Sequence, residues 1–169
     1  GMFVGKTGSG SVRRAVIAFE VAAGVPAGSR ITEVSLSLNL SRTRSGAQTV
    51  ALHRLLADWG EGNSSATGGS GAPATTGDAT WLHRSFDTEL WARPGGDFSE
   101  AVSAVTSVDG EGRYTWSSVE MVAEVQRWLE NPGENFGWVI LGNETAKGTT
   151  KRFDTRESPE VANRPWLRI

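Results

Sequence analysis

Hydrophobic and polar residues alternate along most of the chain. The clearest run ends at Leu40, where Val34, Leu36, Leu38 and Leu40 are separated by polar residues. Successive side chains of a strand point to opposite faces, so this run predicts a strand with one buried and one solvated face. Similar patterns predict further strands at 13–21, 49–56, 113–116, 136–142, 151–153 and 166–169.

Two of these segments carry definite expectations about which side chains are buried. Each is expected to be one continuous strand with a single apolar face. The buried faces are expected to consist of Ile17, Phe19 and Val21 in the first segment, and of Val50, Leu52 and Leu56 in the segment 49–56.

One segment, 117–130, has helical periodicity, because its apolar residues recur every three or four positions. Ser117 and Glu120 form a Ser-x-x-Glu pattern, which predicts a capping box at the start of the helix. The sequence Asn131-Pro132-Gly133 is expected to end it. We expect this helix to close one end of the strand layers.

Residues 60–80 are rich in Gly, Ser, Ala and Thr. Such a segment buries little apolar surface, so it predicts a long loop. Its small side chains favour a tolerated insertion over a binding loop. Strands with one short helix predict a single all-β domain over 1–169, a two-sheet antiparallel β-sandwich of the jelly-roll type.

Composition narrows the classes of function. The 169 residues carry a net charge of −2, which gives no electrostatic case for binding nucleic acid or an anionic membrane. No apolar run approaches the roughly 20 residues of a membrane span. The absence of cysteine excludes disulfides, thiolate zinc sites and cysteine nucleophiles. The chain opens Gly1-Met2-Phe3-Val4-Gly5, without a signal-peptide pattern.

Several stretches, in order along the chain, carry a specific resemblance. They are Arg14–Val21, Val25–Thr32, Val34–Leu40, Asp58–Gly62, Ala79–Trp81, Pro94–Phe98, Val122–Leu129, Asn135–Trp138, Arg152–Glu157 and Arg164–Ile169. Together they resemble the DNRLRE-type domains, secreted bacterial jelly-roll modules that are similar to carbohydrate-binding modules.

The chain departs from that family at two points. Glu20 stands where the family usually has Asp. Family members also begin with an extra strand before the segment that corresponds to Met2–Gly5, and this strand is missing here. We favour a trimmed sequence as the reason. Otherwise one sheet has an open edge, which a neighbouring strand could fill.

The resemblance implies carbohydrate binding, in which aromatic rings stack on sugars and polar groups surround them. Trp81 and Trp91 flank loop-like stretches, with Asp78 and Arg93 nearby, and Trp166 is expected to face outward. These five residues are the predicted ligand site. The other tryptophans are expected to be core residues or a structural anchor: Trp116, Trp128, Trp138 and Trp59.

A structural Ca²⁺ ion is common in jelly-roll sugar-binding modules, and carboxylates near strand ends could bind one. The candidates are Glu61, Asp97, Asp154 and Glu157. No Asp-x-Asp-x-Asp spacing is present. We therefore favour the alternative that Arg152 and Arg156 form ion pairs with the neighbouring carboxylates.

The sequence does not predict an enzyme. It has no Gly-x-Ser-x-Gly elbow, no phosphate-binding loop before a helix, and no identifiable pair of facing carboxylates. The main hypothesis is a secreted, extracellular module that binds polysaccharide or a cell-surface glycan. The alternative is a structural subunit of an extracellular fibre, joined to copies of itself or to neighbouring domains by strand donation.

Overall fold

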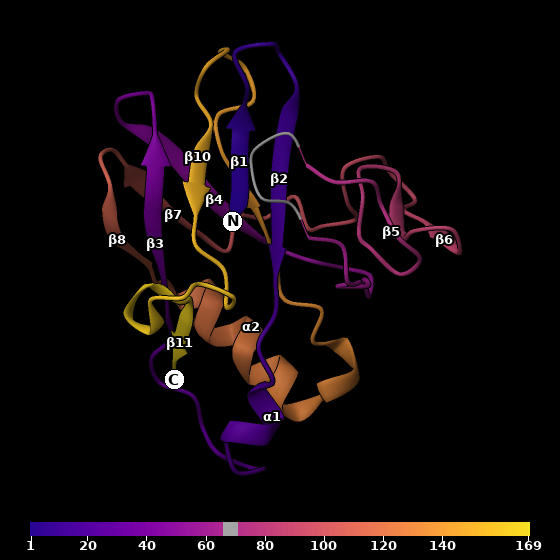
Figure 1. Cartoon of the computed structure of the whole chain (residues 1–169). Coiled ribbons are helices and arrows are strands. Elements are labelled where there is room, and N and C mark those ends of the chain that lie inside the picture. The colour runs from indigo at the N-terminus through magenta and orange to yellow at the C-terminus, as the bar shows by residue number, and fades with distance from the viewer. Residues whose placement is uncertain (66–70) are drawn as a thin grey trace.

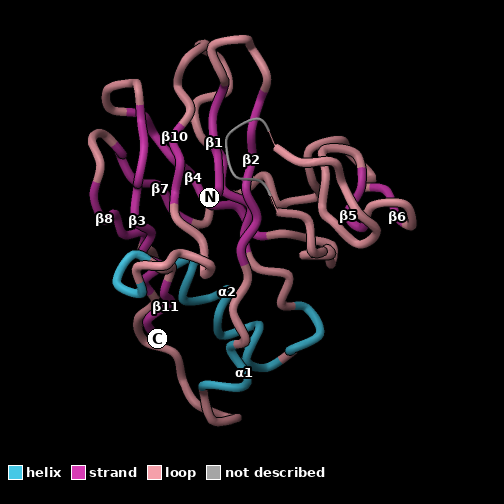
Figure 2. The backbone as a smooth tube through the Cα atoms, in the orientation of Figure 1, coloured by secondary structure: helices cyan, strands magenta, loops and turns pink. Residues whose placement is uncertain are grey.

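The structure is a computed structural model that describes residues 1–65 and 71–169 (Figure 1). Strands dominate the described residues (Figure 2), and every strand pair among them is antiparallel. This confirms the predicted mostly-β architecture. The strands are β1 (Met2–Lys6), β2 (Val12–Ile17), β3 (Ser35–Thr43), β4 (Gln48–Arg54), β5 (His83–Ser85), β6 (Glu89–Leu90), β7 (Ala104–Val108), β8 (Gly112–Trp116), β9 (Trp138–Leu141), β10 (Lys151–Phe153) and β11 (Trp166–Arg168).

Most strands belong to one large sheet with the order β11-β3-β10-β1-β2-β9-β4-β7, in which β8 also pairs with β3. β8 lies beside β3, near one end of this order, and β7 is the other end. These two strands approach each other, since Thr106 of β7 donates its hydroxyl hydrogen to the carbonyl oxygen of Thr115 in β8 at 2.7 Å. The sheet is therefore nearly closed. The strands β5 and β6 form a separate small sheet.

The large sheet encloses one apolar core. The predicted core residues Trp116, Trp128 and Trp138 are all buried there, together with alternate residues of each long strand. The helix α2 (Val119–Glu130) lies across the lower end of the sheet in Figure 1, close to the short helix α1 (Val21–Gly24). None of the helices in residues 1–65 and 71–169 has the length and apolar run needed to cross a bilayer.

The strand at 13–21 is shorter than expected. It ends at Ile17, and Val21 begins α1 instead of extending the strand. The reason is the partner: β9 begins only at Trp138, which pairs with Ile17, so the chain after Ile17 has no strand beside it. Phe19 still packs against the core.

The same boundary cuts short the strand predicted at 49–56. β4 ends at Arg54, which also pairs with Trp138. The expectation that Leu56 points inward is wrong, since 47% of its surface is exposed. Leu55 is buried instead, in a second apolar cluster on the outer face of the sheet.

The predicted capping box does not form. The N-cap of α2 is Ser118, whose hydroxyl oxygen accepts a hydrogen bond from the backbone N–H of Met121 at 3.0 Å. The hydroxyl of Ser117 instead donates to the carbonyl oxygen of Val34 at 2.7 Å. The hydroxyl of Ser118 also donates to the carbonyl oxygen of Ser103, so both serines bond to distant segments. The sequence pattern placed the N-cap one residue too early.

The first strand, which the sequence pattern did not predict, lies between β10 and β2 in the strand order. β1 pairs with β10 on one side and with β2 on the other. Met2, Phe3 and Val4 pair only with β10, and Gly5 and Lys6 pair only with β2. Among the described residues, Met2–Val4 therefore have no partner strand on their other side. The end strand β11 pairs only with β3.

Lys151 joins two turns from inside the protein. Its side chain is fully buried, and its ammonium group donates to the carbonyl oxygens of Ser45 (3.0 Å), Gly46 (2.8 Å) and Asp109 (2.8 Å). These carbonyls belong to the turn between β3 and β4 and the turn after β7. Burial lowers the pKa of Lys151, and the Asp109 carboxylate opposes that shift.

Replacing this ammonium should destabilise the fold. Lys151→Met leaves three carbonyl oxygens without their donor, so we expect a loss of about 3 kcal/mol in the free energy of unfolding. Denaturation in urea measures it. The matched control is Lys147→Met, because Lys147 is exposed and its replacement should change stability by less than about 0.5 kcal/mol. Equal stabilities of the two variants would show that the ammonium is not a structural requirement.

Candidate functional site

Between β4 and β7 the chain leaves the large sheet and covers part of its outer face. This excursion, described over residues 55–65 and 71–103, contains β5 and β6, which lie at the right in Figure 1. It packs on the sheet through a second apolar cluster built on Leu55, Trp91 and Val139. Val139 belongs to β9, so this strand is buried on both faces.

Strand register shows which side chains share the uncovered part of the outer face. Arg14 of β2 pairs with Leu141 of β9, Leu141 pairs with Ala51 of β4, and Ala51 pairs with Val105 of β7. Their chain neighbours, such as Ala15 and Leu52, point into the core. Arg14, Leu141, Ala51 and Val105 therefore form a row across the outside of the sheet.

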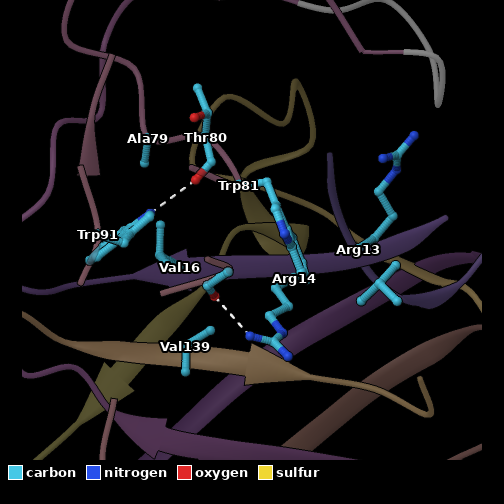
Figure 3. A pocket seen from close by; sticks show the side chains of 10 residues that line it. Arg13, Arg14, Val16, Ala79, Thr80, Trp81, Trp91 and Val139 are labelled. Carbon is cyan, nitrogen blue, oxygen red and sulfur yellow. Dashed lines mark hydrogen bonds between the residues drawn. The ribbon is translucent and has the colours of Figure 1, made fainter. Parts of the chain in front are cut away.

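A hollow of about 280 Å³ lies between this face and the excursion (Figure 3). Arg13, Arg14 and Val16 of β2 line one side, and Trp81 and Trp91 line the other. Trp81 is 43% exposed, whereas Trp91 is only 6% exposed. The indole N–H of Trp91 donates to the carbonyl oxygen of Thr80 at 2.9 Å, so this ring forms a fixed wall.

Arg14 fixes the position of Trp81. Its guanidinium donates to both carboxylate oxygens of Glu144, from Nε at 2.7 Å and from Nη2 at 2.9 Å. A third donor, Nη1, reaches the carbonyl oxygen of Gly95 at 2.9 Å. The guanidinium carbon lies 4.9 Å from the centroid of the Trp81 ring, which is a cation–π contact. One face of Trp81 is therefore supported by a group that is itself held in place.

Gly95 is required by this packing. Its φ angle is +91°, and a Cβ atom there would lie 2.5 Å from Nη1 of Arg14 and 3.0 Å from the Trp81 ring. A side chain at this position would displace either the guanidinium or the ring.

A second hollow, of about 580 Å³, adjoins the first. Gln48 and His53 of β4 line it, with Asn143 and Glu144 from the segment after β9. The side-chain amide of Asn143 donates to Oε1 of Gln48 at 2.9 Å, and Nδ1 of His53 lies 2.9 Å from the carbonyl oxygen of Ser99. The Arg14–Glu144 ion pair forms the border between the two hollows. We call the two hollows together the outer groove, lined by Arg13, Arg14, Gln48, Thr49, Ala51, His53, Thr80, Trp81, Trp91, Leu141, Asn143, Glu144 and Thr145.

The structure brings two of the five predicted ligand residues together. Trp81 and Trp91 line the same hollow, although only Trp81 offers an exposed ring. Arg93 is exposed and lies outside the lining of the groove. Trp166 is 43% exposed but belongs to β11, where Arg113 lies over its ring at 5.9 Å.

Asp78, the fifth predicted residue, turns toward its own loop. Its carboxylate accepts hydrogen bonds from the backbone N–H groups of Thr75 (2.6 Å) and Ser64 (3.3 Å), and the residue is 5% exposed. Burial acts to raise the pKa of Asp78, but the hydrogen bonds from Thr75 and Ser64 outweigh it and leave the pKa below its ordinary value. Asp78 therefore shapes the loop that leads to Trp81. The part of this loop at 66–70 lies outside the described residues.

The four candidate calcium ligands do not converge. Asp97 accepts the backbone N–H groups of its own loop, and Asp154 accepts the amide of Asn39. Glu61 and Glu157 both pair with Arg156. Within residues 1–65 and 71–169, no three His, Asp or Glu side chains are grouped so that they could hold a metal ion.

The alternative of arginine–carboxylate pairs is only partly realised. Arg156 pairs with Glu157, as expected, and also with Glu61. Arg152 instead donates to the hydroxyl of Ser41 at 3.1 Å.

Much of the groove escaped the sequence analysis. Arg14 and Glu144 are 130 residues apart, and no local pattern shows that they meet. One usable signal was present on β4, where the outward-facing Ala51 lies between the polar Thr49 and His53. A small residue between polar ones on an outer face indicates a notch in that face.

Comparisons with protein-family models, with curated proteins and with solved structures found no match to this chain. The function must therefore be argued from the groove. Its chemistry is that of an exposed aromatic ring beside amide, hydroxyl and imidazole groups, with an internally neutralised ion pair at its centre.

The carboxylate of Asp78 should stabilise the fold in a pH-dependent way. Because the folded state lowers its pKa below 3.8, its contribution is fully present at neutral pH and is lost as the pH falls through the folded-state pKa. Asp78→Asn should therefore lower the free energy of unfolding at pH 7, and its difference from the unsubstituted protein should shrink below about pH 3.8. Denaturant titrations across this pH range measure both quantities.

The control for this experiment is Asp87→Asn, at an exposed carboxylate. It should change stability by less than about 0.5 kcal/mol at either pH. A cost of Asp78→Asn that stays constant with pH would mean that the carboxylate charge is not responsible.

Proposed function

We propose that this chain is a non-catalytic module that binds polysaccharide or a cell-surface glycan in the outer groove. The observation that carries the proposal is Trp81, an exposed indole ring held by Arg14 beside a polar hollow. Sugar rings have apolar faces that stack on aromatic side chains and hydroxyl groups that require hydrogen-bonding partners. The groove offers both within one surface.

Several polar groups of the groove are available to such hydroxyls. Among the described residues, the amide nitrogen of Gln48, the hydroxyl of Thr145 and Nε2 of His53 have no hydrogen-bond partner. Each hydrogen bond contributes about 0.5–1.5 kcal/mol, and an aromatic contact adds a similar amount. Single-site binding is therefore weak, and repetition of the module raises it by multivalency.

The finer description of the fold belongs to the same proposal. The large sheet divides into two groups of strands that are linked only through the pairs Gly5–Arg13 and Lys6–Val12 of β1 and β2. This division supports a two-sheet jelly roll, as the resemblance to DNRLRE-type domains implies. An extracellular location is part of the proposal, and no step of it requires a calcium ion.

Strand donation, the alternative function, has less support. The edges at β1 and β11 are short, because only Met2–Val4 of β1 lack a partner strand on one side and β11 covers only Trp166–Arg168. An edge of three residues offers few backbone groups to an added strand.

Replacing the Trp81 ring should abolish most of the binding. Native affinity electrophoresis in gels that contain β-glucan, xylan, glucomannan or polygalacturonate should show retardation by at least one of these polymers. For that polymer, Trp81→Ala should weaken binding by about tenfold or more, which corresponds to about 1.4 kcal/mol.

The chain offers a matched control in Trp166→Ala, since both tryptophans are 43% exposed and both have an arginine over the ring. Trp166→Ala should bind as the unsubstituted protein does. Loss of binding in this variant alone would place the site on β11, and no retardation by any of the four polymers would contradict the proposed function.

A further inference from the structure

The outer groove is longer than a single stacked sugar requires. The hollow beside Trp81 has about 280 Å³, and the adjoining hollow has about twice that volume. If the ligand were one sugar on Trp81, the second hollow and its polar lining would contribute nothing. The two hollows share the border formed by Arg14 and Glu144.

We infer that the outer groove takes an extended glycan chain of several sugars, which runs from Trp81 over the Arg14–Glu144 pair into the hollow lined by Gln48, His53 and Asn143. This inference rests on the proposed function and adds the form of the ligand and the residues that select it.

The floor of the groove has the shape that such a path needs. Leu141 and Ala51 are neighbours in the row across the sheet, and Ala51 is the smallest side chain in that row. On β4 it lies between the outward-facing Thr49 and His53, which form the two sides of a notch. At the far end of the row Val105 is 58% exposed, so nothing in the described structure closes the groove there.

The charge along the path also fits a chain of hydroxyl-bearing sugars. Arg14 and Glu144 make two hydrogen bonds to each other, so the crossing point carries no net charge. Beyond it the second hollow presents the amide of Gln48 and the imidazole of His53, which can donate to or accept from hydroxyls. The second hollow has no exposed aromatic ring among its lining residues, so we expect it to recognise the chain by hydrogen bonds.

Ala51→Phe tests the inference because it fills the notch and leaves Trp81 and Arg14 unchanged. The probes are oligosaccharides of three to six sugars prepared from whichever of β-glucan, xylan, glucomannan or polygalacturonate retards the protein most. Calorimetric titration should show that affinity for the unsubstituted protein rises by about tenfold or more from the trisaccharide to the hexasaccharide. Ala51→Phe should remove this rise and leave trisaccharide binding unchanged.

Two further variants complete the experiment. Gln48→Ala should lower hexasaccharide affinity by about fivefold and leave trisaccharide affinity unchanged, since only the longer chain reaches Gln48. Ala23→Phe, on the exposed surface of α1, adds the same ring elsewhere and should have no effect. Retained trisaccharide binding shows that the Ala51→Phe protein is folded. If the Ala51→Phe protein does not bind the trisaccharide, the hexasaccharide affinity of Gln48→Ala becomes the test. An affinity equal to that of the unsubstituted protein would then overturn the inference.

The failures of the two proposals can be distinguished. If a polymer retards the protein and Trp81→Ala abolishes this, but affinity does not depend on chain length, the extended-chain inference is wrong and the proposed function stands. The same holds if both Ala51→Phe and Gln48→Ala bind the hexasaccharide normally. If none of the four polymers retards the protein, both proposals fall.

Discussion

The burial of β9 on both faces is the constraint on which the rest of the structure depends. Trp138 and Ile140 point into the main core, while Val139 is covered by the excursion between β4 and β7. Because β9 lies between β2 and β4, its first residue also sets where both neighbours end. One strand of four residues thus joins the main core to the second cluster and attaches the excursion that carries Trp81.

The excursion covers only part of the outer face, and the Arg14–Glu144 pair lies at its margin. The side chains are 19% and 25% exposed, so the pair is partly shielded from water. An exposed ion pair contributes little to stability, but a bidentate pair with a further bond to Gly95 fixes its geometry. The indole of Trp81 rests on this fixed group. A ring that is already oriented loses little conformational entropy when a ligand stacks on it, which favours binding.

Local patterns predicted the features that depend on local sequence. The alternation that ends at Leu40, the helical periodicity of α2 and the burial of Trp138 follow from neighbouring residues. Features set by distant partners were missed. The ends of β2 and β4 depend on where β9 begins, and at the start of α2 Ser117 bonds to the distant Val34 while Ser118 forms the cap. Trp81 and Trp91 have the same local signature, a tryptophan beside a loop. Only the packing of the excursion shows that one ring is exposed and the other buried.

Two carboxylates of the excursion, one of them the calcium candidate Asp97, have a structural role in the loops. Asp97 accepts N–H groups of Ala92 and Arg93, and Asp78 accepts those of Thr75 and Ser64. Lys151 does the converse and donates to carbonyl oxygens of two turns. In each case a charged side chain satisfies backbone groups that a turn leaves unpaired. Anionic side chains serve turns that present N–H groups, and a cationic one serves turns that present carbonyls.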